Sequence, residues 1–94
     1  MEVVRVQGGN KKHKVLIYTI STCGWCKRTK KFLSDIGIEF EYVDIDLCSK
    51  EDREMIRNEI RRRGGELLYP SMIIDDKVLI QGFQEDKIKE LLAF

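Results

Sequence analysis

Two cysteines, Cys23 and Cys26, lie between an apolar run and a helix-like stretch, and the rest of the chain is arranged around them. The run at residues 15–18 is apolar and rich in strand-forming side chains, which is typical of a buried strand. The thiolate is the nucleophile in disulfide exchange, and the unpaired N–H groups of a helix N-terminus stabilise it. The pattern therefore predicts that Cys23 caps the following helix and attacks a disulfide. Cys26, one turn further in, would resolve the mixed disulfide.

Size and charge restrict the classes of protein to which the chain can belong. Its 94 residues are enough for one domain with its own core, so we expect a single domain over residues 1–94, with residues 1–13 as an N-terminal extension. The 17 basic and 16 acidic residues nearly cancel, which argues against a nucleic-acid partner. Residues 1–7 do not resemble a signal peptide, and no apolar run approaches the ~20 residues of a membrane span. We expect a cytoplasmic monomer with no membrane partner.

The remaining chain alternates between helix-like and strand-like patterns. The helix that Cys23 caps is predicted to present an apolar face from residue 26 until Gly37 ends it. A strand over residues 38–45, parallel to the first, follows. A second helix begins after Ser49, a hairpin turns at residues 75–77, and a third helix begins at residue 84 or 85. The residues expected to be buried by the last two helices are Met55, Ile56, Ile60, Ile88, Leu91 and Leu92.

The N-terminus allows two interpretations. Residues 3–7 alternate well enough for a short strand hairpinned onto the sheet edge, and they fit a loosely ordered tail equally well. His13, which follows them, is expected to be a solvated loop residue, because nothing near it in the sequence would pair with it.

The order of these elements and three short motifs resemble the glutaredoxin-like members of the thioredoxin superfamily, over residues 14–94. The motifs are the cysteine pair itself, Tyr69-Pro70-Ser71 before the hairpin and Gln81-Gly82-Phe83 before the last helix. The resemblance implies an α/β thioredoxin fold, with a four-stranded mixed sheet of order 2-1-3-4 and three helices. An N-terminal strand would add one edge to this sheet. The resemblance also implies that Pro70 follows a cis peptide bond and faces the cysteines.

The same resemblance implies a dithiol thiol–disulfide oxidoreductase that reduces protein disulfides and holds no bound cofactor. Cys23 and Cys26 are the expected catalytic pair, and the backbone at residues 69–70 would pair with an extended substrate segment. Trp25 is expected to expose an apolar surface, the alternative being a partly buried packing residue. The expected substrate-binding residues are Trp25, Lys27, Tyr69, Pro70, Gly82 and Phe83.

Several positions depart from the glutaredoxins that use glutathione. Ile20 stands where many of them carry a lysine for a glutathione carboxylate, and Gln84-Glu85 stands where they carry an acidic pair. Gly24-Trp25 replaces Pro-Tyr between the cysteines, and Gln81-Gly82 replaces Gly-Gly. Each lost charge-assisted hydrogen bond removes about 1.5–3 kcal/mol of binding free energy, which weakens the binding of glutathione by roughly tenfold or more. Glutathione is therefore a doubtful reductant, and a reductase of the thioredoxin-reductase type is the expected electron source.

Two other functions remain open. NrdH-type redoxins are glutaredoxin-like and are reduced by thioredoxin-reductase-type enzymes, so the chain could donate electrons to ribonucleotide reductase. A zinc-binding module could use Cys23, Cys26, Cys48 and His13, although a second Cys-x-x-Cys is absent. Cys48 is expected at the same sheet edge as Cys23, within ~10–15 Å of the active site. Under oxidation Cys48 would form an off-pathway bridge or a dimer; the alternative is an unreactive residue at a helix start.

Overall fold

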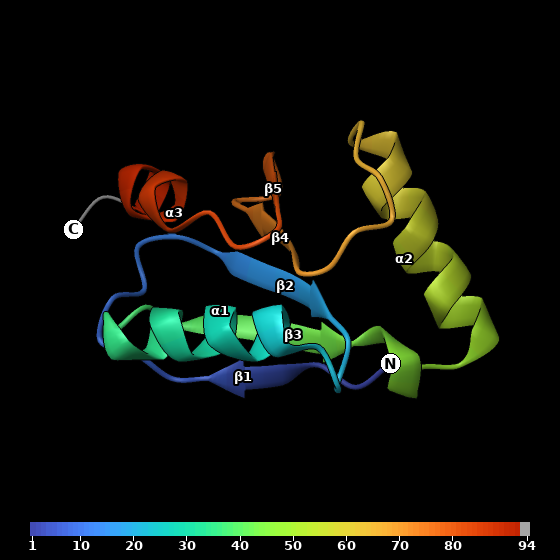
Figure 1. Ribbon diagram of the computed structural model, residues 1–94, viewed down its shortest axis with the longest axis horizontal. Coiled ribbons are helices and arrows are strands. Elements are labelled where there is room, and N and C mark those ends of the chain that lie inside the picture. Colours follow the sequence, from blue (N-terminus) through green and yellow to red (C-terminus); the bar gives the residue numbers. More distant parts are fainter. Residues whose placement is uncertain (93–94) are drawn as a thin grey trace.

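Five strands form one mixed sheet in the computed structural model, which describes residues 1–92 (Figure 1). The two parallel neighbours are β2 and β3, and the other neighbouring strands are antiparallel. The sheet order is β1-β3-β2-β4-β5. Without β1 this is the expected order 2-1-3-4, so the predicted thioredoxin topology is confirmed. The strands are β1 (Val4–Val6), β2 (Val15–Thr19), β3 (Phe40–Asp44), β4 (Ser71–Ile74) and β5 (Val78–Gln81).

The N-terminal residues form an ordered edge strand. Val4 lies opposite Tyr42 and Val6 opposite Phe40, in antiparallel register. Val6 is half-buried and packs against the same core as Phe40. β1 therefore covers the outer edge of β3 and does not form a hairpin with β2, its neighbour in the sequence (Figure 1).

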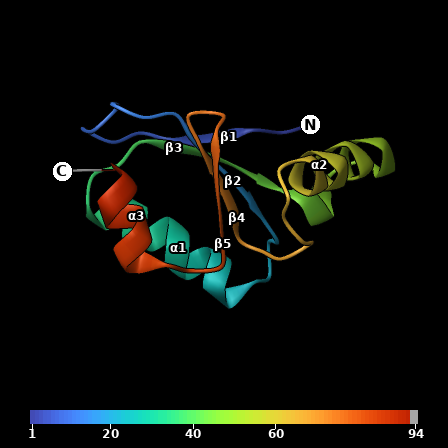
Figure 2. The same cartoon turned by 90° about the horizontal axis from the view of Figure 1, so that it is seen from above.

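Three helices cover the two faces of the sheet: α1 (Gly24–Asp35), α2 (Lys50–Arg62) and α3 (Glu85–Leu92). Helices α1 and α3 lie on one face and α2 on the other (Figure 2), so each face has its own core. The buried core beneath α1 and α3 consists of Val15, Ile17, Leu33, Ile38, Phe40, Met72, Ile74, Ile80, Ile88 and Leu92. The buried core beneath α2 consists of Tyr18, Val43, Ile45, Ile56, Ile60 and Ile73. Within residues 1–92, no helix is long and apolar enough to cross a membrane.

The helix ends agree with the sequence patterns, whereas one residue that was expected to be buried is exposed. Gly37 follows α1 with a φ of 76°, which suits the glycine that terminates a helix. The Oγ of Ser49 accepts a hydrogen bond from the N–H of Asp52 at 3.2 Å and so caps α2. The prediction that Met55 is buried is wrong, because its side chain is 62% exposed on the outer face of α2. Leu91 is only half-buried, at the rim of the core.

The β4–β5 turn is tied to the start of β2 through one carboxylate. Asp75 and Asp76 have φ values of 54° and 57°, the positive values that suit the two central residues of the tight turn that the Lys77 N–H closes on the Ile74 C=O at 3.0 Å. The Asp75 carboxylate accepts hydrogen bonds from Lys14 N–H at 2.8 Å and from His13 Nδ1 at 2.7 Å. The His13 hydrogen bond holds the pKa of Asp75 below its ordinary value. His13 is a loop residue, as expected, but it is not merely solvated, because it has a partner that is distant in the sequence.

Candidate active site

Cys23 occupies the N-cap of α1, in the loop that follows β2. Its backbone is extended, with φ −82° and ψ 121°, and its Sγ accepts a hydrogen bond from Cys26 N–H at 3.3 Å. Burial by itself would raise the pKa of Cys23, but hydrogen bonds from Cys26 and from the Trp25 N–H, together with the charge of Lys30, lower it below its ordinary value. The local fold therefore favours a thiolate at Cys23.

Cys26 has the opposite environment, although it lies only one helical turn away. Its side chain is 0% exposed, packed inside the first turn of α1. Burial and the hydrogen bond to Cys23 raise the pKa of Cys26 to about 12. The two pKa shifts have opposite directions, so the pair holds its proton more tightly at Cys26 and favours the negative charge at Cys23, which makes it an asymmetric dithiol.

Lys30 is the cation whose charge lowers the pKa of Cys23. Its Nζ lies 3.2 Å from Asp44 Oδ1 and 3.7 Å from the centroid of the Tyr42 ring, so it is anchored at the end of β3. The same oxygen of Asp44 accepts a hydrogen bond from the buried Thr19 hydroxyl at 2.6 Å. Lys27, an expected substrate-binding residue, is exposed. The missed signal is the spacing of Lys30, which lies four residues after Cys26.

The loop before β4 reaches the same sheet edge as the cysteines. Ser71 lies opposite Tyr18, so β4 begins where β2 ends. The peptide bond before Pro70 is cis, as expected, and Pro70 C=O accepts a hydrogen bond from Gly82 N–H at 2.8 Å. This hydrogen bond joins the loop before β4 to the loop before α3. The structure therefore brings residues 69–70 and 82–83 to one edge together with Cys23.

An aromatic surface flanks Cys23 on the side of α1 and α3. The ring of Trp25 is 57% exposed, which confirms its expected exposure. Its centroid lies 6.2 Å from that of Phe83, and Phe83 makes an edge-to-face contact with Phe32 at 5.5 Å. The guanidinium of Arg28 lies 5.0 Å from the Trp25 centroid.

The opposite flank of the site carries two further cations that the sequence pattern did not assign to the site. Burial raises the pKa of Tyr69, and the positive charges of Arg57 and Arg61 oppose this effect. Arg57 and Arg61 are four residues apart and so share one face of α2. Arginine on a helix face is usually a solvated surface residue, so only the packing of α2 beside the loop at Tyr69 reveals this placement.

The four residues of the zinc alternative do not lie together. Cys48 follows β3 at the sheet edge of Cys23, whereas His13 precedes β2 at the opposite edge. Among residues 1–92, no group of three or more His, Cys, Asp or Glu side chains could hold a metal ion.

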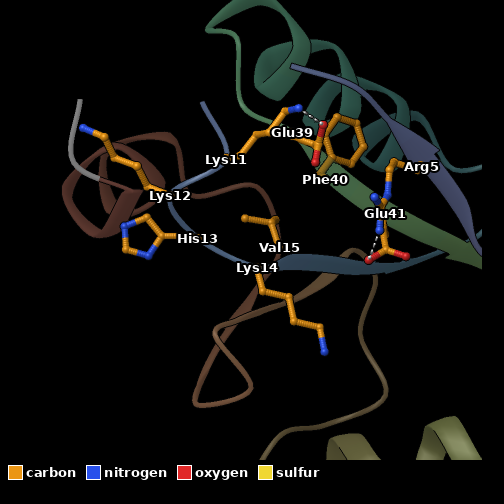
Figure 3. A pocket seen from close by; sticks show the side chains of 9 residues that line it. All are labelled: Arg5, Lys11, Lys12, His13, Lys14, Val15, Glu39, Phe40 and Glu41. Atoms are coloured by element: carbon orange, nitrogen blue, oxygen red, sulfur yellow. Dashed lines mark ion pairs between the residues drawn. The ribbon is translucent and has the colours of Figure 1, made fainter. Parts of the chain in front are cut away.

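A cavity of about 230 Å³ lies at the end of β2 that is remote from the cysteines (Figure 3). Its charges are largely paired, with Arg5 3.7 Å from Glu41 and Lys11 3.9 Å from Glu39. It contains no thiol, so it does not extend the redox site. The lining residues are Arg5, Lys11, Lys12, His13, Lys14, Val15, Glu39, Phe40 and Glu41.

A dithiol with one stabilised thiolate and one buried thiol, at the edge of a thioredoxin fold, defines a thiol–disulfide oxidoreductase. Within that class the chain belongs to the glutaredoxin family, because the family model described as Glutaredoxin matches residues 15–79. Family membership implies disulfide substrates and reduction by glutathione or by a reductase.

Solved structures and curated sequences agree with this assignment. The glutaredoxin of Methanosarcina mazei Go1 is 39% identical, with a TM-score of 0.88 over 100% of this chain and 90% of that one. Methanoredoxin of Methanosarcina acetivorans is 40% identical, with a TM-score of 0.76 over 86% of this chain and 85% of that one. A glutaredoxin-like 8.6 kDa protein of the rubredoxin operon of Clostridium pasteurianum is 32% identical over 79 residues, which are 83% of this chain and 96% of the relative.

Proposed function

We propose that the chain reduces protein disulfides, with Cys23 as the nucleophile and Cys26 as the resolving thiol. The Cys23 thiolate attacks one sulfur of the substrate disulfide, forms a mixed disulfide and expels the other sulfur as a thiolate. Cys26 then gives up its proton and attacks Cys23, which releases the second substrate sulfur and leaves a Cys23–Cys26 disulfide. The observation that carries this division of roles is the contrast between the N-cap position of Cys23, whose Sγ accepts a hydrogen bond from the Cys26 N–H, and the full burial of Cys26.

The proposed substrate segment binds in extended form along the loop before β4. Within residues 1–92, no hydrogen bond engages the backbone N–H or C=O of Tyr69, so both are available to a substrate strand. Pro70 has no N–H, and its C=O is already bound by Gly82. The exposed ring of Trp25 and the neighbouring Phe83 would contact the segment on its other side. Lys27 would add a positive charge at the rim of this substrate-binding surface.

Insulin reduction driven by dithiothreitol tests this proposal. The wild-type chain should accelerate the precipitation of insulin chains, and each enzyme molecule should turn over many times. A metal analysis of the same sample addresses the zinc alternative. A rate no faster than dithiothreitol alone would overturn the proposed function.

For the electron source we propose a thioredoxin-reductase-type enzyme over glutathione. Ile20 packs at the edge of the apolar core beneath α2 and supplies no cation for a carboxylate. We expect Ile20→Lys to raise the glutathione-dependent rate by several-fold without changing the dithiothreitol-dependent rate. Brisk turnover of the unmodified chain with glutathione and glutathione reductase would contradict this expectation, and Arg57 and Arg61 would then be the compensating cations. An NrdH-type donor would have the same reductant, with ribonucleotide reductase as its disulfide substrate.

A further inference from the structure

A hollow of about 290 Å³ lies beside the active site, between α1 and the start of α3. Phe32 and Phe83 supply its apolar surface, and their contact with each other continues through Phe83 to the exposed ring of Trp25. Trp25 directly precedes Cys26, so this apolar surface runs from the cysteine pair into the hollow. The lining residues are Arg28, Lys31, Phe32, Asp35, Phe83 and Glu85.

The charged side chains around the hollow differ in whether they form ion pairs. Lys31 forms an ion pair with Asp35 at 2.7 Å, and Glu85 forms one with Lys89 at 3.3 Å. Arg28 has no ion pair and no hydrogen bond within residues 1–92, and its guanidinium lies over the Trp25 ring at 5.0 Å. A guanidinium carries five N–H donors and matches a carboxylate in a two-pronged geometry. The hollow therefore presents one cation whose charge no neighbouring acid neutralises.

The position of Arg28 relates this cation to the cysteines. Trp25, Arg28 and Phe32 follow one another at spacings of three and four residues, so they form one stripe along α1. The stripe begins between the two cysteines and ends in the hollow. A substrate chain that leaves the attacked sulfur in this direction would first meet the Trp25 ring, then the guanidinium, and then the aromatic pair.

We propose that this hollow binds the part of a protein substrate next to the attacked cysteine, and that it selects an apolar side chain accompanied by an acidic residue. The apolar side chain packs against Phe32 and Phe83, and the carboxylate pairs with Arg28. This inference rests on the proposed reduction of protein disulfides and adds the class of segment that is preferred. Exposed ion pairs contribute about 0.2–1 kcal/mol, so the carboxylate should change the rate by about 1.4- to fivefold.

Symmetric peptide disulfides test this preference without assuming a binding direction. The probes are disulfide-linked homodimers of a peptide X-Phe-Cys-Phe-X with blocked ends, in which X is Asp, Asn or Lys. The second-order rate constant for the reduced chain is divided by that of dithiothreitol on the same peptide, which removes the intrinsic reactivity of each disulfide. The wild-type chain should prefer the Asp peptide to the Asn peptide by about 1.4- to fivefold, and the Lys peptide should be slowest. High salt should reduce these ratios.

Variants of Arg28 identify the responsible cation. Arg28→Gln should abolish the Asp-over-Asn preference, and Arg28→Glu should reverse the order in favour of the Lys peptide. Lys12→Gln is the matched control, because it removes one positive charge at the remote end of β2 and should keep the wild-type ratios. Equal wild-type rates on the three peptides, or an unchanged preference in Arg28→Gln, would overturn the inference.

Two further probes separate this inference from its alternatives. Glutathione disulfide supplies carboxylates without an aromatic side chain, so Arg28→Gln should slow the Asp peptide more than it slows glutathione disulfide. An equal loss for both would overturn the assignment to a protein segment. Bis(2-hydroxyethyl) disulfide is uncharged, and the wild-type chain should reduce it. Failure to reduce both this probe and insulin would overturn the proposed function and this inference with it, whereas equal peptide rates alone would overturn this inference and leave the proposed function intact.

Discussion

Cys23 and Cys48 follow the ends of two neighbouring parallel strands, yet the pKa values of their thiols are shifted in opposite directions. Cys23 follows β2 and faces the N-terminus of α1, where its Sγ accepts a hydrogen bond from a backbone N–H. Cys48 follows β3 and a 3-10 turn, η1 (Ile45–Leu47), and its Sγ donates to the C=O of Asp44 at 3.6 Å. The pKa of Cys23 is lowered, whereas burial and the negative charge of Asp52 raise that of Cys48.

The difference shows that position at the sheet edge does not by itself activate a thiol. The two loops touch, since Ser21 N–H donates to Asp46 Oδ1 at 2.8 Å, so both cysteines lie in the same part of the molecule. What differs is the local environment of each sulfur. Hydrogen bonds and the charge of Lys30 stabilise a thiolate at Cys23, whereas burial and the negative charge of Asp52 disfavour one at Cys48.

Serine substitutions give the largest expected contrast. Cys23→Ser should abolish insulin reduction, because no thiolate remains to attack the substrate. Cys26→Ser should instead accumulate a mixed disulfide with the substrate, detectable by mass spectrometry, since Cys23 can attack but nothing resolves the product. A Cys26→Ser variant that turns over insulin at the wild-type rate would show that external thiols do the resolving.

The order of alkylation compares all three thiols in one experiment. Only a thiolate reacts with iodoacetamide, and each thiolate forms as the pH rises through the pKa of its group. Because the pKa is lowered at Cys23, raised at Cys48 and raised to about 12 at Cys26, labelling should begin at Cys23 in mildly acidic solution. Cys48 should follow at alkaline pH and Cys26 last, measured by peptide mapping of the reduced chain. Early labelling of Cys26 would reverse the assigned roles.

Removal of the Lys30 charge should raise the pKa of Cys23 and so reduce its difference from Cys48. Lys30→Met takes away a cation that lowers the pKa of Cys23, so alkylation of Cys23 at mildly acidic pH should slow by about two- to fivefold. The pH at which its thiolate absorbance appears should rise. Lys31→Met is the control, because Lys31 is exposed and paired with Asp35 on another side of α1. Equal slowing in both variants would assign the effect to net charge and not to Lys30.

The smallest effect is expected at Cys48. Cys48→Ser should leave insulin reduction within about 20% of the wild-type rate, since the raised pKa keeps this thiol protonated near neutral pH. Peptide mapping after peroxide treatment should find the Cys23–Cys26 disulfide and none that contains Cys48. A disulfide of Cys48 at low peroxide would establish it as a third redox-active thiol.

The sequence by itself determined most of the fold and the core of the site. The spacing of Cys23 and Cys26 places one sulfur at a helix N-cap and the other one turn inside, because both positions depend on local backbone geometry. The strand–helix–strand order around them dictates parallel strands and a right-handed crossover. These features depend on neighbours in the chain, and for that reason the pattern of residues predicts them.

Only the tertiary structure decided which side chains from distant segments meet. Lys30 acts on Cys23 from a position that Asp44 and Tyr42 hold, fourteen and twelve residues further along the chain. His13 meets Asp75 at a separation of 62 residues, and the exposure of Met55 depends on which face α2 turns to the sheet. Such pairs depend on strand register and helix rotation. Periodicity along the chain carries little information about either, because many arrangements bury nearly the same apolar side chains.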